Sequence, residues 1–184
     1  MTPKILISGT GRCGTTFLMK LFSFLGFDTG YTKQTYKSQI NSISKSGMET
    51  KLNTSHRVVK NPAFIEEQYL KHIIQNNIPV QYFIIPIRNY SESAESRSKL
   101  PRASGGLWNA TDQKTQEEFY NKLMSTFLLY ATKHDFNVIY IDFQRMISNK
   151  KYLYDKLLPV LKEKTISFEA FCTEYNECSK DAIK

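Results

Sequence analysis

The sequence predicts an α/β fold: a three-layer sandwich in which helices flank a central parallel sheet. Three observations support this prediction. A short apolar run near the amino terminus leads through a glycine-rich loop directly into an amphipathic helix. Residues 80–87 are apolar along almost their whole length, which is typical of a strand buried on both faces of a parallel sheet. Apolar runs and helical segments then alternate, an order that indicates parallel strands joined by right-handed crossovers.

The expected elements follow one another without an internal repeat or a long linker, so residues 1–184 are expected to form a single domain. Gly26 is a plausible cap for the first helix. The carboxyl-terminal part should be helical, with breaks at Pro159 and at residues 163–165. The expected strands are residues 5–8, 57–60, 80–87 and 137–142, and the expected helices are residues 15–25, 63–76, 91–99 and 112–134.

Composition limits the class of protein. The chain has 184 residues, of which 41% are hydrophobic and 23% charged, so it can bury a core without disulfides. Its three cysteines have no disulfide or metal-ligand spacing, so we expect a reducing compartment and no metal site. No apolar segment is long enough for a membrane span, and the amino-terminal run is too short for a signal peptide, which predicts a cytoplasmic protein without stable membrane insertion. The net charge of +8 favours anionic ligands but does not identify one.

The segment Gly-Thr-Gly-Arg-Cys-Gly-Thr-Thr at residues 9–16 has the glycine spacing of a Walker A phosphate loop (P-loop). In such loops the backbone N–H groups at the start of a helix converge on phosphate oxygens. ATP-using loops carry a lysine after the last glycine, but this chain has Thr15 there and its basic residue is Arg12. The missing lysine weakens the case for kinase or ATPase chemistry and suggests a different anion. A purely structural turn is the alternative.

Residues 9–18 resemble the 5′-phosphosulfate loop of the sulfotransferase superfamily, with Cys13 in place of the usual serine. The resemblance implies a sulfuryl donor, 3′-phosphoadenosine 5′-phosphosulfate, which becomes adenosine 3′,5′-bisphosphate after transfer. It also implies that Arg12 is a catalytic cation at the leaving oxygens. Phe17 occupies a position that often stacks on the adenine, although it could equally belong to the core. The residues implied to bind the donor are Gly9, Arg12, Cys13, Gly14, Thr15, Thr16 and Phe17.

A second motif has the spacing that this superfamily uses for the 3′-phosphate, an arginine after a central strand and a serine eight residues later. Arg88 follows the strand at 80–87, and Ser96 lies eight positions further on. A guanidinium can bind a phosphate with two N–H groups, and a hydroxyl can complete the site. Tyr90 replaces the proline that usually stands two positions after the arginine. The alternative is an ordinary helix start with solvated polar residues.

The catalytic residues are predicted from weaker patterns. Residues 58–62 resemble the strand ending in Lys-x-Pro of bacterial sulfotransferases, which implies that Lys60 approaches the transferred group from the acceptor side. Superfamily members use a histidine or a glutamate as the general base. His56 is the first candidate here, and the further candidates are Asp28, Glu49 and Glu66.

The sequence therefore predicts a metal-independent sulfotransferase acting on a hydroxyl group of a sugar, lipid, peptide or metabolite. The alternatives are a P-loop nucleotide kinase or hydrolase and a non-catalytic nucleotide-binding domain. A nucleic-acid partner is not expected, because no aromatic residues are interleaved with a basic patch. The polar residues 30–55, either a mobile lid or an insertion, and the loop carrying Trp108, either a cavity wall or a core contact, are expected to enclose the acceptor. The oligomeric state stays open.

Overall fold

The computed structural model describes residues 2–180 and contains a four-stranded sheet in which every strand pairing is parallel. The spatial order is β2-β1-β3-β4. The predicted α/β fold with a central parallel sheet is thereby confirmed. The strands are β1 (Lys4–Ile7), β2 (Val58–Lys60), β3 (Val80–Ile87) and β4 (Val138–Asp142).

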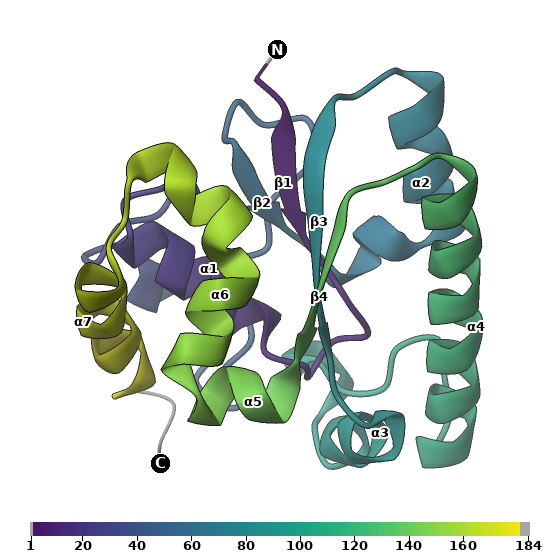
Figure 1. The fold of residues 1–184 in the computed structure, drawn as a ribbon. Helices are drawn as coiled ribbons and strands as arrows, with labels where there is room; N and C mark the ends of the chain where they lie inside the picture. The colour runs from purple at the N-terminus through teal and green to yellow at the C-terminus, as the bar shows by residue number, and fades with distance from the viewer. Residues whose placement is uncertain (1, 181–184) are drawn as a thin grey trace.

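Helices cover both faces of the sheet, which makes the three layers visible in Figure 1. One face carries α1 (Thr15–Phe24), α5 (Phe143–Ser148), α6 (Lys150–Leu161) and α7 (Phe168–Ser179). The other face carries α2 (Glu67–Gln75) and α4 (Gln113–Lys133), and α3 (Tyr90–Ser98) packs against α4. Short 3₁₀ turns are η1 (Tyr36–Gln39), η2 (Pro62–Ile65), η3 (Arg102–Ser104) and η4 (Lys162–Lys164).

The core lies on both sides of the sheet because side chains alternate along a strand. In β1, Ile5 and Ile7 belong to the cluster packed against α1, α6 and α7, whereas Leu6 belongs to the cluster packed against α2 and α4. All three side chains are completely buried. The amino-terminal apolar run is therefore a central strand that anchors the following glycine loop from both faces.

The order of the strands places a crevice at the carboxyl ends of β1 and β3. These two strands are neighbours, but the helix that follows β1 lies on one face of the sheet and the helices that follow β3 lie on the other (Figure 1). Such a switch point is where open α/β sheets bind their ligands. The glycine loop follows β1 and Arg88 follows β3, so both predicted anion motifs lie at this crevice.

Two predicted element boundaries are corrected. Pro159 does not break the tail, because it lies inside α6, on its exposed side. The missing N–H is one that would have bonded the carbonyl of the exposed Asp155, which water can satisfy, while the buried Leu157 and Val160 hold the helix in the core. The predicted helix at 63–76 is divided into the 3₁₀ turn η2 and α2, whereas the break at 163–165 is confirmed by η4. Within residues 2–180, no helix has the length and apolarity to cross a membrane.

Candidate functional site

The glycine loop between β1 and α1 has a backbone that only small residues adopt readily. Gly11 and Gly14 have φ values of 78° and 92°, and Arg12 between them is also left-handed, with φ of 56°. Left-handed residues within a turn can direct successive backbone N–H groups into an anion-binding concavity. A Cβ atom on Gly11 would come within 2.2 Å of an Arg97 Nη2 atom. Glycine at position 11 therefore allows a guanidinium to approach the loop backbone.

The amino terminus of α1 is open to a ligand. Its N-cap residue Gly14 makes no side-chain capping bond, and its first turn holds no acidic residue. Every other α-helix in the described part of the chain has a side-chain cap or, in α2, an acidic residue in the first turn. The partial positive charge and the free N–H groups of α1 are thus available to an external anion.

Arg12 joins the two predicted motifs. Its Nε donates to Ser96 Oγ at 3.1 Å, and its Nη1 donates to the carbonyl of Ser44 at 2.5 Å. Arg88 donates from Nη1 to the Arg12 carbonyl at 3.2 Å. Ser96 and Arg88, which lie 84 and 76 positions after Arg12 in the sequence, are thus in direct contact with the glycine loop. The predicted loop cation and the predicted second motif form one cluster.

The cluster contains more guanidinium groups than carboxylates that pair with them. Arg88 also pairs with Glu92 at 3.1 Å, but among residues 2–180 neither Arg12 nor Arg97 pairs with a carboxylate. Burial lowers the pKa of Arg12, and the neighbouring charges of Arg97 and Arg88 lower it further. Like charges held together without counter-charges destabilise the ligand-free protein. An anion bound among them would relieve this repulsion.

Arg97 is a residue of the candidate site that the sequence reasoning missed. Only 8% of its surface is exposed, its Nη1 donates to the carbonyls of Gly105 (3.2 Å) and Gly106 (2.6 Å), and its guanidinium lies 5.3 Å from the centre of the Trp108 ring. Its buried Nε has no hydrogen-bond partner among the described residues. The available signal was its position directly after Ser96, on a helix that begins at the crevice.

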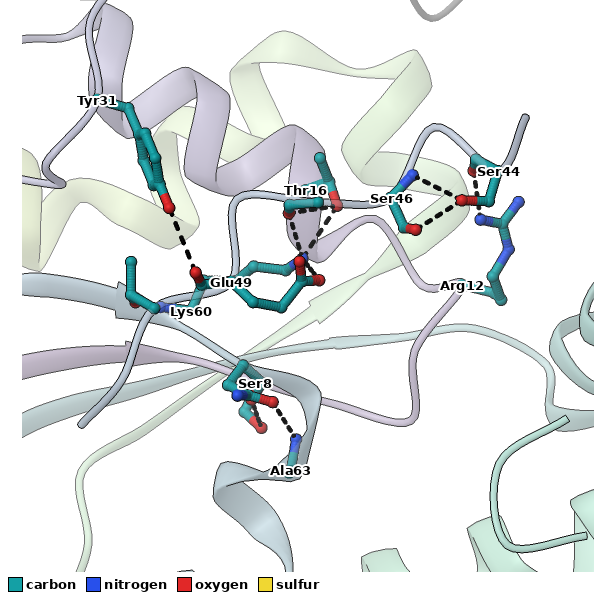
Figure 2. A network of polar contacts seen from close by, with 12 residues as sticks. Ser8, Arg12, Thr16, Tyr31, Ser44, Ser46, Glu49, Lys60 and Ala63 are labelled. Carbon is teal, nitrogen blue, oxygen red and sulfur yellow. Dashed lines mark hydrogen bonds and ion pairs between the residues drawn. The ribbon is translucent and has the colours of Figure 1, made fainter. Parts of the chain in front are cut away.

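Lys60 is the fourth cation, and it is 99% buried at the end of β2. Its Nζ donates to Thr16 Oγ1 (3.1 Å), to the Gly47 carbonyl (2.7 Å) and to Glu49 Oε1 (2.6 Å), as Figure 2 shows. Burial lowers the pKa of Lys60, and the charge and hydrogen bond of Glu49 oppose this decrease. The Lys-x-Pro segment thus brings its lysine to the first turn of α1.

The remaining loop residues divide between the cavity and the core. Thr15, Thr16 and Phe17 line the cavity described below, and Phe17 also packs edge-on against Tyr175 with ring centres 5.4 Å apart. Phe17 is thus both a cavity and a core residue. Cys13 is completely buried and faces Gly9, and burial raises the pKa of its thiol. Cys13 is not among the residues that line the cavity.

The structure does not bring His56 to this cluster. His56 precedes β2, at the opposite end of the sheet from the loop, and its Nδ1 lies 2.8 Å from Asp28 Oδ1. Glu66 lies at the start of α2 and accepts a bond from Gln68. Of the four predicted base candidates, Glu49 alone lines the cavity.

Residues 40–49 lie against the loop. An isolated bridge pairs Ile40 with Gly47, and the carbonyls of Ser44 and Gly47 accept bonds from Arg12 and Lys60 (Figure 2). These two carbonyl oxygens accept hydrogen bonds from N–H groups that an anion would also use. A ligand anion must displace them or share the cations with them.

The loop cavity has a volume of about 420 Å³ and lies at the carboxyl ends of the strands. Five basic residues line it, Arg12, Lys45, Lys60, Arg88 and Arg97, against a single carboxylate, that of Glu49. This volume is within the range of small-molecule sites, about 300–1,000 Å³.

Neither a scan against protein-family models nor a search of curated proteins finds a match for this chain. The function must therefore be inferred from the chemistry of this cavity.

Proposed function

We propose that the protein is a sulfotransferase that moves a sulfuryl group from 3′-phosphoadenosine 5′-phosphosulfate to a hydroxyl acceptor. The observation that carries the proposal is the contact between the two motifs: Arg12 of the glycine loop donates to Ser96, and Arg88 donates to the backbone of Arg12. A donor with a phosphosulfate and a separate 3′-phosphate needs two adjacent anion sites of this kind.

The residues present fit such a donor. The uncapped first turn of α1, Arg12 and Lys60 would hold the phosphosulfate, and Arg88 with Ser96 would hold the 3′-phosphate. The surplus of guanidinium groups without carboxylate partners supports a ligand with several negative charges. Phe17, on the cavity wall, is available to contact the adenine.

Glu49 is the proposed general base, in place of His56. Its described ion pair with Lys60 uses Oε1, so Oε2 can accept the proton of an acceptor hydroxyl. Glu49 takes this proton as the acceptor oxygen bonds to sulfur. Arg12 offsets the charge that develops on the 5′-phosphate oxygen as its bond to sulfur breaks, and Lys60 offsets the charge of the transferred group.

Two alternatives to the sulfotransferase have less support. A kinase holds the β- and γ-phosphates with a lysine after the last glycine of the loop, where this chain has Thr15. A kinase also needs a carboxylate to hold its metal ion, but the one carboxylate that lines the cavity, that of Glu49, forms an ion pair with Lys60. A non-catalytic nucleotide binder would need no base, and a carboxylate beside the anion site therefore favours the enzyme.

Thermal unfolding with different nucleotides tests the proposal. Adenosine 3′,5′-bisphosphate at 100 times its dissociation constant should stabilise the protein by about 2.7 kcal/mol, and adenosine 5′-monophosphate at the same concentration by much less. Arg88→Ala should remove this difference. Sulfate transfer should persist in EDTA, and magnesium-dependent ATP hydrolysis should be absent. Equal stabilisation by both nucleotides, or ATP turnover that EDTA abolishes, would overturn the proposal.

A further inference from the structure

Two further cavities adjoin the loop cavity in a row. The middle cavity, of about 310 Å³, shares Glu49, Pro62, Arg97 and Gly105 with the loop cavity. The distal cavity, of about 480 Å³, shares Asn61 with the middle cavity. The proposed base Glu49 therefore stands between the loop cavity and the middle cavity. A molecule that occupies the middle and distal cavities would present its nearest hydroxyl group to this carboxylate.

The distal cavity combines amide and aromatic side chains. Its amides are Asn53, Asn61 and Gln68, and its accessible aromatic ring is that of the partly buried Tyr69, since Phe64 is completely buried. Lys51 and His72 complete the polar part of the lining. An amide can donate to one hydroxyl group and accept from the next, and the C–H face of a sugar ring packs against an aromatic ring. Asn61 Oδ1 accepts from Ala63 N and Gln68 Nε2 donates to Glu66 Oε2, which leaves the other polar atoms of these two amides and the amide of Asn53 for a ligand. A polyhydroxylated ligand can bond to these atoms, whereas an alkyl chain cannot.

The middle cavity continues this lining and adds positive charge. Trp108 forms part of its wall, together with the buried Arg97 and the exposed Arg102. The Trp108 ring is partly buried and packs edge-on against Phe119 with ring centres 5.0 Å apart, which fixes its position. The middle cavity can therefore hold a sugar ring against a rigid aromatic face.

A peptide acceptor bound by strand addition does not fit. The exposed edge of the sheet beside these cavities is β2, whose outward backbone groups are already paired within the chain. Val58 N donates to the Asp28 carbonyl at 2.9 Å, the Thr50 N–H donates to the Lys60 carbonyl at 2.8 Å, and Lys60 N donates to Thr50 Oγ1 at 2.8 Å. No row of free backbone groups is left there for a peptide.

From the three adjoining cavities we propose that the acceptor is an oligosaccharide of at least two sugar units, one in the middle cavity and one in the distal cavity. The role of Glu49 in this assignment rests on the proposed sulfotransferase function. The binding of the oligosaccharide itself depends only on the middle and distal cavities.

The fluorescence of Trp108, the single tryptophan of the chain, tests this proposal without any need for turnover. The wild-type protein is titrated with monomers, dimers and trimers of four sugar series: maltose, cellobiose, chitin and oligogalacturonate. In at least one series the affinity should rise tenfold or more from monomer to trimer. A 1-alkanol of similar length and a serine-containing tripeptide should give no saturable change.

Variants locate the binding. Asn53→Ala and Gln68→Ala should reduce the affinity for the trimer at least fivefold and leave the affinity for the monomer within twofold. Asn176→Ala, an exposed asparagine on α7 on the opposite face of the sheet, is the matched control and should change neither. Binding that does not depend on saccharide length, no saturable change with any saccharide, or a preference for the alkanol or the peptide would overturn the oligosaccharide assignment.

The same protein is titrated calorimetrically with adenosine 3′,5′-bisphosphate. Bisphosphate binding together with a flat saccharide titration would overturn the acceptor assignment alone. Length-dependent saccharide binding without bisphosphate binding would overturn the proposed donor and leave the oligosaccharide cleft. The two failures are therefore distinguishable.

Discussion

Replacing Glu49 with glutamine should destabilise the protein in a way that depends on pH. The carboxylate of Glu49 is the only carboxylate in contact with Lys60 among the described residues, and the lysine side chain is 1% exposed. The substitution keeps the shape of the side chain but removes its charge. A buried ammonium then remains with two neutral acceptors, Thr16 Oγ1 and the Gly47 carbonyl.

The size of the effect follows from the burial of the two partners. Removing one partner of a fully buried ion pair costs about 3–5 kcal/mol. The Glu49 side chain is 44% exposed, so water already screens part of the attraction, and the cost should be about 2 kcal/mol at pH 7. For a domain of this size, this cost corresponds to a decrease of about 4–8 °C in the melting temperature.

The effect should decrease as the pH rises. Burial lowers the pKa of Lys60 from its ordinary value of 10.5, and removing the opposing charge of Glu49 lowers it further. Between the folded pKa and 10.5 the unfolded chain binds more protons than the folded protein, so the free energy of unfolding increases with pH in this window. Neutral Lys60 no longer needs a counter-charge, so the difference between Glu49→Gln and the wild-type protein should become smaller toward pH 10.

Urea unfolding at pH 7 and at pH 9.5 measures both quantities. Glu95→Gln is the matched control, because it breaks an ion pair with Lys99 in which both side chains are more than half exposed. This control should leave the stability almost unchanged, because an exposed ion pair contributes little. A Glu49→Gln variant as stable as the control, or one whose destabilisation does not change with pH, would refute the inferred coupling between Glu49 and Lys60.

Three further predictions concern the reaction. Glu49→Gln should keep the bisphosphate affinity within threefold but reduce turnover about 10²–10⁴-fold, as expected for the loss of a general base. His56→Asn should keep most of its activity. If steady-state assays showed a large loss of turnover for His56→Asn and a small one for Glu49→Gln, His56 would be the base. Arg12→Ala should reduce kcat more than it weakens donor binding, and unchanged kcat at saturating donor would exclude a catalytic role. Gly11→Ala, which places a methyl group 2.2 Å from Arg97 Nη2 on a left-handed backbone, should weaken bisphosphate binding at least tenfold by calorimetry; unchanged affinity would remove Arg97 from the anion site.

Local patterns in the sequence were sufficient for the fold class and for the glycine loop. Alternating burial along β1, the apolar run of β3 and the glycines before α1 are short-range signals, because backbone periodicity and left-handed φ values act within a few residues. The distance of His56 from the loop could also have been predicted. A strand rises about 3.3 Å per residue, so four residues of extended chain place His56 ~13 Å from Lys60.

The sequence by itself determined the parallel α/β architecture, the glycine loop that carries Arg12, and the positions of Lys60 and Arg88 at the ends of their strands. Only the tertiary structure decided which of these side chains touch. The contact of Arg12 with Ser96 spans 84 residues and exists because β1 and β3 are neighbours in the sheet. The choice of Glu49 over His56 depends in the same way on the path of residues 40–49 across the loop. Such contacts depend on chain crossovers and on side-chain burial, which no local pattern encodes.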